Sequence, residues 1–168
     1  MRTTFQLPIL NAKNLLLAAI LLLPASNVFA QTGTAAYGKL IITFTDIRSS
    51  VGNIAMGLYT AEEQWTDNPA YNFYWDKKEL REGRLTVELD NLPRGLIYAC
   101  AVLDDEDKSF TMNSTLGLPN EGWGMSTNPS FLKLKKPGFR EVAFELDAPV
   151  IRIEIKLNYF NKNKKVKE

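Results

Sequence analysis

The first group of candidate functional residues is an acidic run that directly follows an apolar stretch. Four acids stand in succession: Asp104, Asp105, Glu106 and Asp107. Side-chain oxygens recur at Asp105, Asp107 and Ser109, the alternate spacing by which calcium loops direct their ligands inward. Asn113 offers a further oxygen ligand. These four residues are therefore the candidate metal ligands, and calcium is the only cofactor that the sequence suggests.

Two features of the same loop disfavour calcium. Calcium loops normally place a glycine at their sharp turn and a bidentate acid at their end. Phe110 stands where that glycine would be, and Lys108 adds a positive charge. Aspartates also favour turns through hydrogen bonds to their own backbone. The sequence therefore favours a solvated acidic turn, with a calcium site as the alternative.

A second group of residues could bind a ligand without reacting with it. Trp123 is flanked by two glycines, whose backbone freedom could hold the indole over a pocket. A sugar or peptide could stack there, with Glu121 accepting a hydrogen bond. Alternatively, Trp123 anchors its loop over the end of the domain, and the aromatic residues of 60–83 plug an open end. Three further candidate ligand-binding residues are Ser126, Trp65 and Tyr74.

The chain has few residues of the types that usually carry out catalysis. The chain has no histidine and a single cysteine, Cys100, which excludes Ser-His-Asp and Cys-His mechanisms and the usual zinc ligand sets. A hydrolase would need two carboxylates from the acidic run and Glu121. Adjacent acids in one turn point in different directions, so Glu121 would have to fold back toward them. We expect no catalytic residues.

Length and charge limit the remaining classes. The chain has 168 residues, of which 45% are hydrophobic, so one domain with an ordinary core is expected. Its net charge is +1, and no basic stripe is present that could neutralise phosphates. Nucleic acid is therefore not an expected partner.

The first 30 residues have the pattern of a signal peptide. Arg2 and Lys13 precede nine apolar residues at 15–23, and small side chains lead to a cleavage position after Ala30. Nine apolar residues are too few to span a membrane, which takes about 20. We expect export to the periplasm or the cell exterior, a flexible lead at 31–37, one domain at 38–160, a basic tail at 161–168 and no transmembrane segment in the mature chain.

Period-two alternation dominates the domain and predicts strands. The segments that show it are 40–46, 54–58, 71–75, 85–89, 96–103, 142–146 and 151–159. Segment 96–103 is apolar on both faces, as in the centre of a sheet. A helical turn is expected at 61–65. The fold class is all-β: an antiparallel β-sandwich, immunoglobulin-like or transthyretin-like, with about seven strands and one long loop.

Two motifs carry a resemblance to a known family. One runs from Gly95 to Asp107, and the other reads Leu-Gly-Leu-Pro-Asn-Glu-Gly-Trp-Gly-Met-Ser at 116–126. They resemble the patterns G-x-Y-A-x-x-x-x-H-D-x-N-x-N-G and L-G-x-P-x-E-G-x-G-x-S of the exported bacterial domain-of-unknown-function family DUF2141. The resemblance covers about Gly38 to Tyr159 and implies export and a β-sandwich. The acidic run departs from it, because Phe110 replaces the glycine of the family pattern.

These observations favour an exported, non-catalytic β-sandwich. Its expected partner is a protein, a peptide or an envelope glycan, bound through the loop at 104–129. The alternatives are a calcium-binding or purely structural accessory protein of the envelope, and a hydrolase that uses carboxylates.

Overall fold

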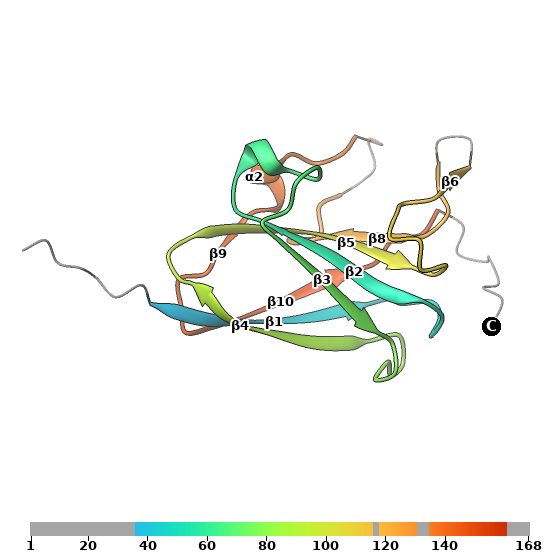
Figure 1. Ribbon diagram of the computed structural model, residues 1–168, viewed down its shortest axis with the longest axis horizontal. Coiled ribbons are helices and arrows are strands. Elements are labelled where there is room, and N and C mark those ends of the chain that lie inside the picture. The colour runs from blue at the N-terminus through green and yellow to red at the C-terminus, as the bar shows by residue number, and fades with distance from the viewer. Residues whose placement is uncertain (1–35, 116–117, 131–134, 161–168) are drawn as a thin grey trace, which may run out of the picture. The chain divides into compact units, whose positions relative to one another are not determined.

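Two β-sheets pack face to face, as the alternating pattern predicted (Figure 1). The computed structural model describes residues 36–115, 118–130 and 135–160. The expected signal peptide, nearly all of the expected lead and the basic tail lie outside the described residues. No helix in the described part of the chain is long and apolar enough to cross a membrane.

The first sheet has three strands in the order β10-β1-β4, and the second is built on the path β3-β2-β5-β8. The strands of the first sheet are β1 (Tyr37–Thr45), β4 (Leu85–Pro93) and β10 (Val150–Lys156). Those of the second are β2 (Asn53–Tyr59), β3 (Tyr71–Asp76), β5 (Ile97–Asp105) and β8 (Gly122–Met125), with β9 (Phe144–Glu145) paired to β5. The smaller elements are the 3-10 helix η2 (Glu62–Gln64), the hairpin β6 (Ser114–Thr115) and β7 (Leu118–Pro119), and the helix α2 (Phe139–Val142).

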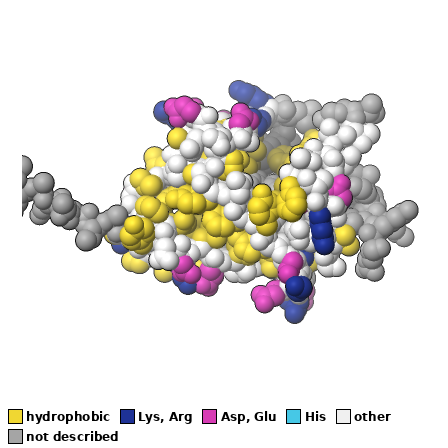
Figure 2. Space-filling model, in the orientation of Figure 1, with side chains coloured by type: hydrophobic (Ala, Val, Ile, Leu, Met, Phe, Trp, Pro, Cys, Tyr) yellow, Lys and Arg dark blue, Asp and Glu magenta, His cyan; other side chains and the backbone are white. Residues whose placement is uncertain are grey.

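The main core lies between the sheets. Alternate residues of each strand point into it, and many of them are fully buried, among them Leu40, Ile42, Ile54, Leu58, Tyr98 and Ile155. Cys100 is also buried here, and burial raises the pKa of its thiol. In the space-filling view, hydrophobic side chains form a band across the middle of the visible face, and charged side chains gather at its margins (Figure 2).

Most of the predicted strands are confirmed, with two differences. β1 and β10 run parallel, although an antiparallel sandwich was predicted. They are the first and last strands of the domain, so no hairpin between them fixes their relative direction. The strand predicted at 142–146 is wrong at its start, because Val142 ends the helix α2 and only Phe144–Glu145 pairs with β5. Val142 is buried in a second cluster rather than in the main core.

This second cluster covers one end of the outer face of the five-stranded sheet. It contains Tyr59, Trp65, Ala99, Phe139 and Val142, contributed by β2, β5, α2 and the segment after η2. The rings of Tyr59 and Trp65 meet edge to face at 5.0 Å, and Trp65 Nε1 donates a hydrogen bond of 2.8 Å to the Pro137 carbonyl. The helical turn expected at 61–65 is confirmed as η2, and the cluster holds it against the sheet.

Ion pairs hold the opposite end of the sandwich together. Lys77 and Asp104 form a pair in which both side chains are 0% exposed. Arg48 donates two hydrogen bonds to Glu106, from Nε at 2.6 Å and from Nη2 at 2.5 Å. Tyr159 OH donates to the second oxygen of Asp104. The acidic run is therefore not the solvated turn that the sequence favoured, because cations distant in the sequence enclose its inward-facing acids.

Substitution of Lys77 by Met should destabilise the fold strongly. Burial raises the pKa of Asp104 and the charge of Lys77 opposes that rise, so loss of Lys77 leaves a buried carboxylate without its cation. We expect Lys77→Met to lower the free energy of unfolding by about 3–5 kcal/mol in urea titrations. The control is Lys78→Met, because Lys78 is exposed and forms a surface ion pair with Asp76. We expect its loss to lower the free energy of unfolding by about 0.5 kcal/mol or less. Equal effects of the two substitutions would contradict a structural role for the buried pair.

Candidate functional site

Three carboxylates converge at the end of β5. Asp105, Asp107 and Glu121 each place an oxygen within 4.8 Å of the other two. Asp105 and Glu121 are buried, and Asp107 is exposed. Asp105 and Asp107 belong to the predicted metal-ligand set, whereas the sequence analysis gave Glu121 to ligand binding. The structure thus brings Glu121, which lies outside the acidic run, beside two of the predicted metal ligands.

Hydrogen bonds bring the other predicted ligands to the same point. Ser109 N donates to Asp105 Oδ1 and to Asp107 Oδ1, each at 3.0 Å. Asn113 Nδ2 donates to Asp107 Oδ2 at 2.6 Å and to Ser109 Oγ at 3.4 Å. The Ser109 side chain is the main cause of the lowered pKa of Asp107, and the hydrogen bond from Ser109 N lowers it further. All four predicted ligand residues thus lie in one small loop.

Glu121 folds back into this loop. Its Oε1 accepts a hydrogen bond from Glu106 N at 3.0 Å, and its Oε2 accepts one from Asn113 N at 3.2 Å. Burial is the main cause of its raised pKa, and the charges of Asp107 and Asp105 add to it. The hydrolase alternative required this return toward the acidic run. Both oxygens of Glu121 are nevertheless engaged by the backbone and its side chain is 2% exposed, so we assign it no acid–base role.

Phe110 adopts the backbone conformation of the glycine that it replaces. Its φ is +57°, in the left-handed region that disfavours residues with a Cβ. Asp105 Oδ2 accepts a hydrogen bond from Phe110 N at 3.1 Å, which fixes the turn. The Phe110 ring is 53% exposed and meets the Tyr74 ring edge to face at 4.9 Å. The turn keeps its shape at the cost of strain, and it presents an aromatic ring outside the loop.

That ring borders a cleft on the outer face of the five-stranded sheet. Strand pairing creates two rows of neighbouring side chains across the sheet. The first row is Tyr74, Ala55, Leu103 and Trp123; the second is Asn72, Gly57, Ala101 and Met125. The small residues lie in the middle strands and most of the large ones at the edges. The Tyr59 side chain lies against Gly57. The floor is therefore low at Ala55 and Ala101 and raised at its sides.

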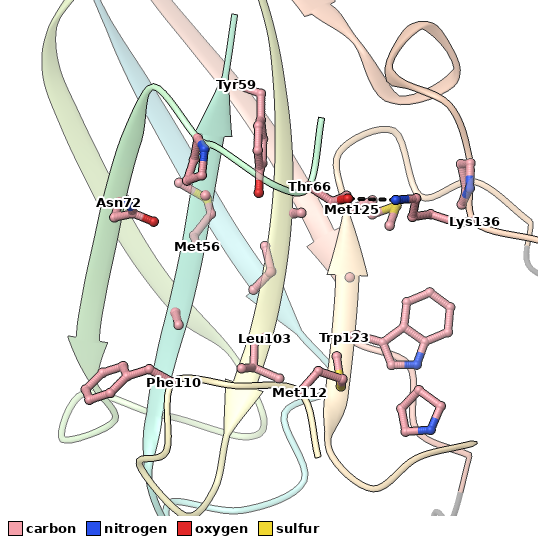
Figure 3. A pocket seen from close by; sticks show the side chains of 18 of the residues that line it. Met56, Tyr59, Thr66, Asn72, Leu103, Phe110, Met112, Trp123, Met125 and Lys136 are labelled. Atoms are coloured by element: carbon pink, nitrogen blue, oxygen red, sulfur yellow. Dashed lines mark hydrogen bonds between the residues drawn. The ribbon is translucent and has the colours of Figure 1, made fainter. Parts of the chain in front are cut away.

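Loops close the cleft at its two ends. Its volume is about 760 Å³, within the range of small-molecule sites. At one end lie Tyr59, Thr66 and Lys136, beside the second cluster (Figure 3). At the other end lie Phe110 and Met112 from the acidic loop, with Leu118 and Pro119 from β7. The loop that gathers the carboxylates thus also forms a wall of the cleft.

The five predicted ligand-binding residues do not share one site. Tyr74 and Trp123 line the cleft from its two sides. Trp65 is 8% exposed and packs in the second cluster, and Glu121 belongs to the carboxylate loop. Ser126 is fully buried; its hydroxyl donates to the Val142 carbonyl and accepts from Cys100 N, which joins the segment after β8 to α2 and β5.

The sequence analysis missed the floor of the cleft. It identified the inward-facing residues of 54–58, but it did not use the other face of the same strand, Ala55 and Gly57. In 54–58 small residues alternate with large buried ones, and Ala101 continues this pattern in the neighbouring strand. Such a pattern predicts an outer sheet face with few large side chains. Met125 and Lys136 carried no comparable sign, because the elements that bring them to the cleft were not predicted.

Comparison with known proteins agrees with the resemblance in the motifs. Residues 42–154 match the model of DUF2141, described as an uncharacterized protein conserved in bacteria. The chain belongs to this family. No curated protein and no solved structure matches the chain. Membership of DUF2141 therefore supplies a family without a known activity, and the function has to be argued from the cleft and the carboxylate loop.

The strain at Phe110 can be measured with two substitutions that both remove its ring. Phe110→Gly should have a free energy of unfolding about 1 kcal/mol higher than Phe110→Ala, because only glycine adopts the left-handed region without a steric cost. Urea denaturation of both variants gives the difference. The same two substitutions at Met112, whose φ is not positive, should reverse the order. An alanine variant at 110 as stable as the glycine variant would show that this turn is unstrained.

Proposed function

We propose that this protein is an exported, non-catalytic binding protein that takes an apolar part of its ligand into the cleft on the five-stranded sheet. One observation carries the proposal: a cleft of about 760 Å³ whose lining is mainly apolar, with polar groups at Thr66, Asn72, Lys135 and Lys136. Exposed apolar surface of this kind has a free-energy cost in water that a ligand relieves. The signal-peptide pattern supports export, to the periplasm or the cell exterior.

The chemistry of the lining favours an apolar ligand over an envelope glycan. A sugar needs several hydrogen-bond partners, and its recognition usually includes carboxylate or amide groups around a stacking ring. The lining residues that the structure describes include Asn72 as the only side-chain amide and no carboxylate. Trp123 and Tyr74 flank the floor at opposite sides, where they can contact an inserted hydrocarbon group.

Filling the centre of the cleft should abolish binding. Ala101 lies in the floor, points away from the main core and borders the second cluster, so the ring of Ala101→Phe occupies the cleft. We expect the wild type to bind the neutral dye N-phenyl-1-naphthylamine at one saturable site, detected by fluorescence. Ala101→Phe should weaken this binding at least tenfold.

The matched control is Thr86→Phe, which adds the same ring to the outer face of the opposite sheet. It should leave dye binding unchanged. Melting curves establish that both variants are folded. Absence of saturable dye binding by the wild type would contradict the proposal and favour the purely structural alternative.

A second candidate function is calcium binding by the carboxylate loop. The convergence of Asp105, Asp107 and Glu121 within 4.8 Å supports it, and the oxygens of Ser109 and Asn113 lie in the same loop. These residues would hold the ion through hard oxygen ligands, the type that calcium prefers. The left-handed turn at Phe110 supplies the bend that calcium loops normally obtain from glycine.

Calcium should then stabilise the folded protein. If the affinity is that of extracellular calcium modules, 10 mM calcium raises the free energy of unfolding by about 1.4–2.7 kcal/mol. The melting temperature should then be several degrees higher in calcium than in chelator. Asp107→Asn should reduce this shift, whereas Asp90→Asn, an exposed acid on the other sheet, should not. An unchanged melting temperature of the wild type at 10 mM calcium would eliminate the calcium site.

A further inference from the structure

Charge is distributed unevenly along the cleft. Two lysines, Lys135 and Lys136, are among the lining residues, and none of the lining residues that the structure describes is acidic. Lys136 Nζ donates a hydrogen bond of 2.7 Å to Thr66 Oγ1, which places the ammonium group at the rim (Figure 3). Thr66 Oγ1 in turn donates a hydrogen bond of 3.4 Å to Asp67 Oδ1. The group that this end of the cleft offers to an anion is therefore the ammonium group of Lys136.

The other end of the cleft is apolar. Phe110 and Met112 are 53% and 42% exposed, although both are large hydrophobic residues. In the close-up, Leu103 and Met112 lie between Phe110 and Trp123 (Figure 3). A ligand that matches the whole cleft therefore has an anionic group at one end and a hydrocarbon segment at the other.

A polypeptide fits this cleft poorly. The floor is the face of a sheet whose strands are hydrogen-bonded to one another, so it offers side chains rather than free backbone groups. Peptide N–H and C=O groups buried over it would lose water without gaining partners, which is unfavourable for each group. A hydrocarbon chain has no such groups, and each buried CH₂ favours binding.

We propose that the cleft binds a fatty acid, with its carboxylate at Lys136 and its acyl chain over Ala55, Ala101 and Leu103. This proposal rests on the cleft being the binding site of the protein and adds the class of ligand. The charge of Lys136 sets the orientation of the ligand, and burial of the chain supplies most of the affinity. Affinity should rise about fourfold for each CH₂ added within the length of the cleft.

The test compares ligands of equal chain length and different head group. Dodecanoate and dodecyltrimethylammonium, both below their micelle concentrations, compete for the bound naphthylamine dye on the full-length mature protein. We expect dodecanoate to bind the wild type at least tenfold more tightly. Lys136→Glu should remove or reverse this preference, while Arg152→Glu, the same charge change on the outer face of the opposite sheet, should preserve it.

Each other outcome overturns the proposal in a distinguishable way. Equal affinity for the two head groups, or a preference unchanged in Lys136→Glu, refutes the fatty acid while leaving an apolar cleft that still binds the dye. Tighter binding of an acidic, leucine-rich peptide than of dodecanoate assigns the cleft to a polypeptide. Absence of both dye and dodecanoate binding refutes the cleft as a binding site altogether.

Discussion

Asp104 is the residue through which the separate parts of this domain are joined. Its buried carboxylate pairs with Lys77 after β3 and accepts a hydrogen bond from Tyr159 after β10. Lys77 also donates to the Val51 carbonyl at 2.6 Å, which ties the turn before β2 to the same point. A buried charge is tolerated only when it is paired in this way. The end of both sheets therefore has to close around Asp104.

The direction of Asp104 determines what its neighbours do. Side chains alternate along an extended strand. Asp104 and Glu106 point inward to Lys77 and Arg48, whereas Asp105 and Asp107 turn toward Glu121. The same alternation along β2 and β5 buries Ile54, Leu58 and Cys100 and leaves Ala55 and Ala101 as the floor of the cleft. One periodicity thus produces the core, the carboxylate loop and the binding surface.

This shared periodicity explains which features the sequence could predict. Local alternation can be read from a single sequence. Six of the seven predicted strands and the central position of β5 are confirmed, whereas β8 was not predicted. Contacts between segments that are distant in the sequence produce no local pattern, so they could not be predicted. The pairing of Lys77 with Asp104, the return of Glu121 and the parallel direction of β10 depend on such contacts. The acidic run was misjudged for this reason, because its cations lie far away in the chain.

The central claim is that the outer face of the five-stranded sheet holds a ligand. Nuclear magnetic resonance of protein labelled at methionine and isoleucine methyl groups, titrated with dodecanoate, tests it at individual residues. Met112 and Met125 line the cleft, whereas Ile42 and Ile155 lie in the closed core. We predict saturable shifts of the two methionine methyls with the two isoleucine methyls unchanged. Unchanged methionine signals at saturating dodecanoate, or equal shifts in the core, would contradict the account.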